Sequence, residues 1–140
     1  MLYIDTNILA AYYCPESLSD KIEEILINTE EPAVSQLTEI ELASAISRKI
    51  RENSLSKEDG DIILSLFQTH IDQKSFIYLP IQTKHYSIAK KWIAQFNTPL
   101  RSLDAIHLAI AHEKSIPILT ADAKLANSAK ILGVDAILVL

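Results

Sequence analysis

Glycine and cysteine are scarce in this sequence of 140 residues. Only two glycines occur, which excludes the glycine-rich loops that cradle phosphates. The single cysteine, Cys14, cannot form an internal disulfide, which fits a reducing cytoplasm. No apolar run approaches the roughly 20 residues that cross a bilayer, and no basic region with a long apolar stretch opens the chain. We therefore expect a cytoplasmic protein without a membrane segment or secretion signal.

Charge is acidic overall but unevenly distributed. Hydrophobic residues make up 49% and charged residues 22% of the sequence, which is typical of one globular domain over residues 1–140. The formal net charge of −5 argues against nucleic-acid binding. However, residues 1–47 carry nine acids and one base, whereas residues 84–130 carry seven bases and three acids. This polarity is compatible with a basic face for RNA, and equally with solvated charges on helix faces.

Hydrophobic periodicity predicts strands that alternate with helices or helix pairs. The predicted strands cover residues 2–4, 33–35, 76–79, 116–119 and 136–140. The predicted helices cover residues 8–13, 18–27, 38–51, 57–67, 86–96, 102–114 and 122–132. Alternation of this kind is typical of a parallel sheet covered on both faces. The sequence therefore predicts the α/β class, as a three-layer α/β/α sandwich with a central parallel sheet of about five strands.

Two of these helices carry further local patterns. Thr38 and Glu41 have the spacing of a capping box, which predicts that Glu41 lies in the first turn of the helix over residues 38–51. Tyr86, Trp92 and Phe96 recur at roughly helical spacing, so we expect them to lie on one apolar stripe and to pack in the core.

Four acids are expected at the carboxyl edge of the sheet, where open α/β sheets bind their ligands. Asp5 follows the first strand, Glu41 and Asp104 lie near the starts of helices, and Asp122 follows the fourth strand. Each acid also has a purely structural interpretation. Asp5 and Asp122 are suitable N-caps, Glu41 suits a capping box, and Asp104 suits the positive end of a helix dipole.

Asp104 argues most strongly for a shared site. Its helix is apolar on almost every side, so we expect the carboxylate to be largely buried, and a lone buried carboxylate is costly without a partner. Several carboxylates in one cleft repel each other unless a cation neutralises them. Oxygen ligands alone favour Mg²⁺ or Mn²⁺.

Four segments resemble the PIN-domain ribonucleases, and in particular the VapC-type toxins of toxin–antitoxin pairs. They occur in the order of that family and span essentially the whole chain. They are residues 3–7 (YIDTN), 41–45 (ELASA), 103–109 (LDAIHLA) and 119–122 (LTAD).

The resemblance implies a site and a function. Asp5, Glu41, Asp104 and Asp122 would hold one or two Mg²⁺ or Mn²⁺ ions, with Asp5 and Asp104 as principal ligands. Asn7 and Thr120 match positions that support the site. The implied activity is endoribonuclease cleavage of RNA, with tRNA or rRNA as substrate. The implied partners are a cognate antitoxin, whose C-terminal segment lies in a groove near the site, and a second copy in a homodimer. The apolar helix over residues 55–67 is one surface for such a partner, unless it packs internally.

Other residues are less decisive. Arg48 lies seven positions after Glu41, on the same helix face, where it suits a phosphate contact or a solvated helix end. His107 follows Asp104 by three residues, and a packed, hydrogen-bonded histidine is the favoured interpretation over a catalytic base. Lys84, Lys90, Lys91 and Arg101 are weaker candidates for RNA contacts.

Three other functions are considered. A phosphatase of the haloacid-dehalogenase type also begins from an acid after the first strand, but it needs a second acid two residues later, where this chain has Asn7. A housekeeping PIN nuclease in RNA processing fits the same residues. A non-catalytic RNA-binding or regulatory module would be favoured if the four acids did not bind metal.

Overall fold

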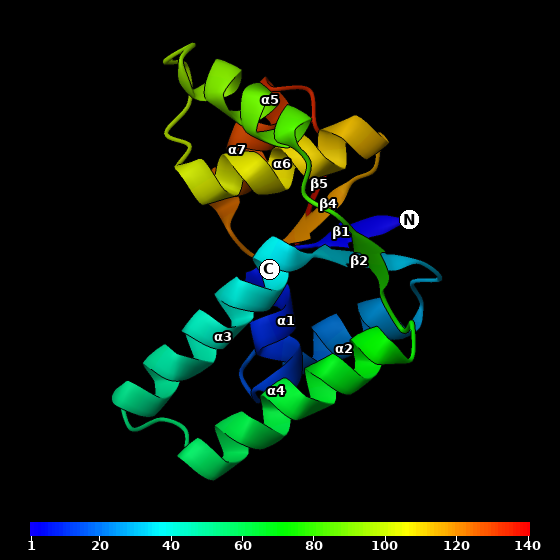
Figure 1. The fold of residues 1–140 in the computed structure, drawn as a ribbon, viewed down its shortest axis with the longest axis vertical. Coiled ribbons are helices and arrows are strands. Elements are labelled where there is room, and N and C mark those ends of the chain that lie inside the picture. Colours follow the sequence, from blue (N-terminus) through cyan, green and yellow to red (C-terminus); the bar gives the residue numbers. More distant parts are fainter.

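The computed structural model describes residues 1–140 as a central sheet of five strands with seven helices (Figure 1). The elements run in the order β1 Leu2–Ile4, α1 Thr6–Tyr13, α2 Ser19–Ile27, β2 Pro32–Ser35, α3 Gln36–Arg51, α4 Lys57–Asp72, β3 Ile77–Leu79, α5 Thr83–Ile93, α6 Ser102–Lys114, β4 Ile118–Thr120, α7 Ala123–Ile131 and β5 Ala136–Leu138. Every predicted strand and helix is present, with bounds that shift by a few residues. The predicted three-layer α/β/α sandwich is confirmed.

The strand order of the sheet fixes where a ligand site belongs. The strands lie in the order β3-β2-β1-β4-β5, and all neighbouring pairs are parallel. The chain therefore builds outward from β1 on one side, through β2 and β3, and then returns to add β4 and β5 on the other side. This reversal between β1 and β4 is a topological switch point, and the crevice for ligands opens at the carboxyl ends of these two strands.

Helices α1–α4 cover one face of the sheet and α5–α7 cover the other (Figure 1). Alternate residues of the strands supply the two cores because side chains along a strand point to opposite faces. Tyr3 and Ala33 pack into the core on the α5–α7 side, whereas Ile4 and Val34 pack into the core on the α1–α4 side. Both faces of the central strands are thus buried, as parallel sheets require.

Helices α3 and α4 pack closely because a glycine lies at their contact. Gly60 is buried in the first turn of α4. A Cβ atom at this position would lie 2.7 Å from Ile50 Cδ1 and 3.1 Å from Ile46 Cγ2. The missing side chain therefore lets the backbone of α4 approach the isoleucines of α3.

The predicted start of α3 is wrong. The helix begins at Gln36 with Ser35 as its N-cap, and Ser35 forms the capping box with Thr38, whose Oγ1 accepts from the Ser35 backbone N–H at 3.1 Å. Thr38 is therefore the third helical residue rather than the cap. Glu41 consequently lies in the second turn, where its carboxylate is free for other contacts.

The predicted apolar stripe over residues 86–96 is only partly correct. Trp92 is buried, but Tyr86 is 55% exposed and Phe96 is 90% exposed. Helix α5 ends at Ile93, and Phe96 adopts a left-handed φ of 56° beyond it. The turn after the helix therefore carries Phe96 away from the core.

The apolar segment over residues 55–67, considered above as a surface for a partner, is partly buried and partly exposed. Phe67 is buried, whereas Ile62 and Leu66 are 64% and 45% exposed.

None of the helices combines the length and the apolar character needed to cross a membrane.

Candidate active site

Asp5 lies directly after the central strand and is the N-cap of α1. Its Oδ1 accepts from the Thr6 backbone N–H at 2.7 Å. Its Oδ2 accepts from the Thr120 hydroxyl at 2.7 Å and from the Asn7 amide at 3.1 Å. Burial raises the pKa of Asp5, while the nearby His107 and the Thr120 hydroxyl act in the opposite direction. Asp5 is thus both a helix cap and a firmly oriented carboxylate.

Thr120 and Asn7 join the ends of β4 and β1. The Thr120 hydroxyl is fully buried and accepts from the Asp122 backbone N–H at 3.0 Å and from Asn7 Nδ2 at 3.3 Å. Asn7 in turn accepts from the Ala121 backbone N–H at 3.1 Å. These contacts bridge the two strands of the switch point and place Asp5 beside the start of α7.

Asp122 is the N-cap of α7. Its Oδ1 accepts from the backbone N–H groups of Lys124 at 2.9 Å and Leu125 at 3.3 Å. Its Oδ2 makes no hydrogen bond within the chain. The N-cap interpretation is therefore correct for Asp122, and one oxygen remains available to a ligand.

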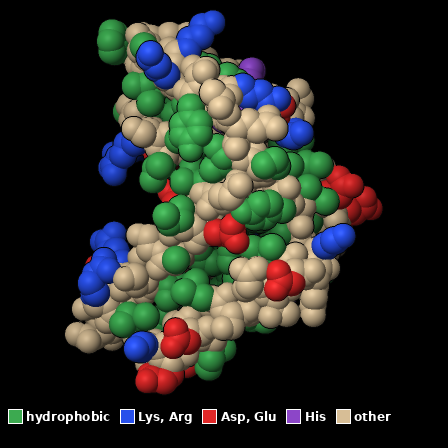
Figure 2. Space-filling view, in the orientation of Figure 1, with side chains coloured by type: hydrophobic (Ala, Val, Ile, Leu, Met, Phe, Trp, Pro, Cys, Tyr) green, Lys and Arg blue, Asp and Glu red, His purple; other side chains and the backbone are tan.

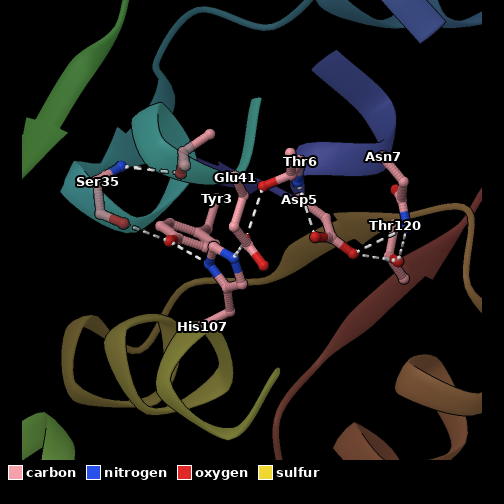
Figure 3. A network of polar contacts seen from close by, with 9 residues as sticks. Tyr3, Asp5, Thr6, Asn7, Ser35, Glu41, His107 and Thr120 are labelled. Atoms are coloured by element: carbon pink, nitrogen blue, oxygen red, sulfur yellow. Dashed lines mark hydrogen bonds and ion pairs between the residues drawn. The ribbon is translucent and has the colours of Figure 1, made fainter. Parts of the chain in front are cut away.

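Glu41 reaches the same edge from the second turn of α3. Its Oε1 accepts from the Thr6 hydroxyl at 2.9 Å and pairs with His107 Nε2 (Figure 3). Its Oε2 makes no hydrogen bond. Burial opposes ionisation of Glu41, but the hydrogen bond and charge of His107 outweigh this effect and lower the pKa of the carboxyl.

His107 belongs to a buried row of polar side chains. Its Nδ1 lies 2.6 Å from the Tyr3 hydroxyl, which lies 2.8 Å from Ser35 Oγ (Figure 3). His107 is 1% exposed, and Tyr3 and Ser35 are fully buried. The expectation of a packed, hydrogen-bonded histidine is confirmed. The row links β1, the end of β2 and α6 to the carboxylate on α3.

Asp104 lies in the first turn of α6, as predicted, but it is half-buried rather than enclosed. It makes no hydrogen bond and no ion pair within the chain. Burial raises the pKa of Asp104, and repulsion from Asp5, Asp122 and Glu41 raises it further. The charge of His107 acts in the opposite direction, but no hydrogen bond or ion pair within the chain compensates the carboxylate of Asp104.

Together these four acids form an oxygen-rich, negatively charged site whose chemistry fits a divalent cation. The repulsion between Asp104 and the other three acids fits such an ion, because a bound cation would offset this repulsion. No three His, Cys, Asp or Glu side chains lie in a geometry that would by itself enclose a metal ion. Asp104 is free to turn because no internal contact holds its carboxylate, and Glu41 and Asp122 each keep one unbonded oxygen.

Sequence comparison identifies the fold family. The model of the family described as PIN domain matches residues 2–131. The chain belongs to the PIN domain family. No curated protein sequence matches this PIN domain significantly.

Solved structures share the fold at low sequence identity. The crystal structure of FitAcB from Neisseria gonorrhoeae has a TM-score of 0.74 and 17% identity, and the match covers 98% of this chain and 96% of that chain. VapBC2 from Rickettsia felis, bound to a DNA fragment from its promoter, has a TM-score of 0.72 and 18% identity over 100% of both chains. VapC20 from Mycobacterium tuberculosis, a toxin that cleaves the Sarcin-Ricin loop, has a TM-score of 0.74 and 12% identity over 91% of this chain and 95% of that chain.

Two open pockets flank the acids of this PIN domain. The larger, with a volume of about 880 Å³, contains Thr6, Asn7 and Glu41 and extends along α3 past Arg48 and Lys49. The smaller, of about 430 Å³, contains Asp104 and Asp122 together with Arg101 and Lys124. Figure 2 shows Lys and Arg side chains on both sides of a notch at the left edge of the molecule. Basic residues therefore stand on both sides of the acids.

These basic residues differ in their internal contacts. Arg48 forms an ion pair with Glu52 at 2.9 Å on the exposed side of α3. Lys49, Arg101 and Lys124 form no ion pair with any acid of the chain. Arg48 therefore has a structural partner, whereas the other three are free to meet an anion.

Sequence reasoning missed three members of the site of this PIN domain, namely Tyr3, Thr6 and Ser35. Tyr3 and Ser35 lie in the predicted strands, and Thr6 lies at a helix start. One pattern does point to Tyr3: it alternates with Ile4 along β1, so it faces the layer that holds α6 and His107.

Proposed function

We propose that this PIN domain is an endoribonuclease that depends on Mg²⁺ or Mn²⁺, and that it is the toxin of a toxin–antitoxin pair. One observation supports the proposal. Asp5 and Asp122 follow β1 and β4 at the switch point, and Asp104, near them and Glu41, has a half-buried carboxylate with no hydrogen bond or ion pair within the chain. A divalent cation would offset the negative charge of the acids and favour the approach of a nucleic-acid phosphate.

Asp5 and Asp104 would be the principal metal ligands, and Glu41 and Asp122 would hold a second ion or orient the attacking water. One or two divalent ions would supply Lewis acidity at the phosphodiester and a water of lowered pKa. The chain itself contributes orientation. Thr120 and Asn7 fix the Asp5 carboxylate at 2.7 and 3.1 Å, and the start of α7 fixes Asp122.

A single RNA strand fits the charge pattern around the acids. Lys49 and Arg48 line the pocket on the Glu41 side, and Arg101 and Lys124 line the pocket on the Asp104 side. A strand that crossed the acids would place phosphates against both basic groups. Among possible substrates we favour tRNA or rRNA, a choice supported by the neighbour from Mycobacterium tuberculosis that cleaves the Sarcin-Ricin loop.

Partners are proposed from the same surface. Solved neighbours include VapBC assemblies and another toxin–antitoxin complex, which supports a cognate antitoxin for this chain. The pocket along α3 offers Leu37, Ile40 and Leu103 to an apolar segment, with Ile40 and Leu103 67% and 47% exposed. We propose that the antitoxin covers this pocket and that the domain acts in the cytoplasm as a homodimer, which sedimentation analysis would test.

Cleavage of defined RNAs tests the proposed activity. Purified protein is incubated with a tRNA and rRNA panel in Mg²⁺, in Mn²⁺ and in EDTA. Asp5→Asn and Asp104→Asn are run beside it, with Asp135→Asn as the matched control at an exposed position away from both pockets. We expect cutting that needs metal, is lost in the first two variants and persists in the control.

Two results would overturn the proposal. Cutting that survives both Asp5→Asn and Asp104→Asn in folded proteins would assign the activity to another site or to a contaminant. Absence of both cutting and metal binding in the folded wild type would favour a non-catalytic RNA-binding module.

A further inference from the structure

We propose that His107 is a positioning residue for Glu41, anchored through Tyr3 and Ser35, and that it leaves a single glutamate oxygen for the cation. This inference rests on the proposed metal-dependent function. It assigns a role to a buried polar row that the four acids alone do not explain.

Consecutive hydrogen bonds connect Ser35, Tyr3 and His107 to the carboxylate of Glu41. An ionised carboxylate only accepts, so His107 Nε2 must donate to Glu41 Oε1. His107 Nδ1 shares a hydrogen bond with the Tyr3 hydroxyl at 2.6 Å, and the Tyr3 hydroxyl shares one with the Ser35 hydroxyl at 2.8 Å. Each group in the row thus fixes the orientation of the next, ending at the carboxylate.

Glu41 Oε1 is fully engaged by this arrangement. It accepts a hydrogen bond from His107 Nε2 and a second one, at 2.9 Å, from the Thr6 hydroxyl. Oε2 accepts no hydrogen bond within the chain. A glutamate on a helix surface ordinarily samples several rotamers. Held by two donors, Glu41 keeps one orientation and one unbonded oxygen at the end of α3 that lies near Asp5 and Asp104.

Burial excludes a direct catalytic role for the histidine. His107 is 1% exposed, and both ring nitrogens are already bonded within the chain. Neither nitrogen can reach a water or a substrate proton without breaking the row. His107 therefore acts through Glu41, in the way that hydrogen-bonded partners behind metal ligands set ligand orientation.

Metal binding measured by calorimetry tests this role with a matched pair of variants. His107→Gln can keep a donor at the position of Nε2, whereas His107→Asn keeps a polar group near Nδ1 and withdraws it from Glu41. We expect His107→Asn to weaken Mn²⁺ binding by about 10–100-fold and His107→Gln to bind within about threefold of wild type.

A double-mutant cycle separates positioning from general packing. In a Glu41→Gln background, His107→Asn should cause no further loss of Mn²⁺ affinity. An equal loss with and without Glu41 would overturn the inference, as would wild-type affinity in folded His107→Asn. If the wild-type protein binds no Mn²⁺, both the proposed function and this inference are wrong. If it binds Mn²⁺ and substitution of His107 does not change the affinity, only this inference is wrong.

Tyr3→Phe provides a second variant in case His107→Asn does not fold. It keeps the buried ring and removes only the hydroxyl that anchors Nδ1. We expect weaker Mn²⁺ binding than wild type with unchanged near-UV circular dichroism. Unchanged affinity in Tyr3→Phe would show that the anchor has no part in positioning Glu41.

Discussion

Asp104 is the residue at which the proposed function and the stability of the metal-free protein oppose each other. Its half-buried carboxylate makes no internal contact, and burial together with three neighbouring acids raises its pKa. We expect Asp104→Asn to increase the free energy of unfolding of the metal-free protein by about 0.5–2 kcal/mol at pH 7, as at other sites that trade stability for activity. Urea denaturation in EDTA measures this, with exposed Asp135→Asn as the control. A less stable Asp104→Asn would contradict the repulsion.

The same repulsion has a defined pH dependence. A carboxyl whose pKa is raised on folding stabilises the protein most below its unfolded value of about 3.9, and this stability is lost as pH rises through the folded pKa. Asp104 is such a group. We therefore expect the stability difference between Asp104→Asn and wild type to be largest at neutral pH and to vanish toward pH 4. Saturating Mn²⁺ at pH 7 should reverse the order of the two proteins. A difference that grew on acidification would refute this assignment.

Thr120 is expected to matter for both orientation and stability. Its fully buried hydroxyl donates to Asp5 and accepts from Asn7 and from the backbone of Asp122. Thr120→Val keeps the shape but removes three hydrogen bonds and leaves the backbone N–H of Asp122 without its partner, so we expect a loss of about 1–3 kcal/mol in the free energy of unfolding. Thr69→Val, at an exposed position of α4, should change it by less than about 0.5 kcal/mol. Thermal and urea unfolding of both variants would decide the matter.

At the scale of elements, the contact between α3 and α4 depends on Gly60. Any side chain there meets Ile50 Cδ1 and Ile46 Cγ2 at 2.7 and 3.1 Å. We expect Gly60→Leu to lower the free energy of unfolding by about 1–3 kcal/mol through overpacking. Gly60→Ala should lose less, because alanine recovers about 1 kcal/mol of helix propensity.

Ser65→Leu provides the matched control for this contact. Ser65 lies on the same helix but is exposed, so its substitution should change the free energy of unfolding by less than about 0.5 kcal/mol. If urea denaturation gave equal changes in the free energy of unfolding for Gly60→Leu and Ser65→Leu, close packing of α3 against Gly60 would be contradicted.

Sequence periodicity predicted which elements exist better than where they begin. Ser35 and Thr38 both satisfy the pattern of an N-cap, and only the register of β2 against its neighbours decides that Ser35 ends the strand and starts α3. Similarly, the apolar spacing of Tyr86 and Phe96 matches a helix, but α5 stops at Ile93 and the turn exposes Phe96. The local sequence cannot determine where these helices begin and end, because tertiary contacts decide between the alternatives.

The acids of the site were predictable for a topological reason, and their supports were not. Helices that return across a parallel sheet begin at its carboxyl edge, so Asp5, Asp104 and Asp122 had to meet there. The contacts of His107 with Tyr3 and Glu41 join residues 104 and 66 positions apart in the chain. No local pattern encodes such pairs, because they depend on how α6 and α3 pack against the sheet.

At the scale of the whole molecule, the proposed RNA substrate would be attracted by local positive charge, because the protein as a whole is acidic. The formal net charge is −5, so long-range attraction is weak and the bases beside the site must supply the contacts. Arg101 and Lys124 lie in the pocket of Asp104 and Asp122 without an ion pair to either acid. Because Arg101 and Lys124 form no ion pair with these carboxylates, their side chains are free to contact an RNA phosphate.

RNA binding by the Asp104→Asn protein, which we expect not to cleave RNA, would measure how strongly these bases contact phosphates. We expect Arg101→Gln and Lys124→Gln each to weaken binding of a single-stranded RNA and to reduce the slope of log K against log salt by about 0.7, the value for one phosphate contact. Lys130→Gln, on the same helix as Lys124 but in a separate pocket with Asn127 and Gly133, should leave the slope unchanged. Fluorescence anisotropy between about 50 and 200 mM salt covers the range in which such contacts are resolved. Slopes that stayed equal in all three variants would remove Arg101 and Lys124 from the RNA path and leave the α3 side, with Lys49, as the route of the strand.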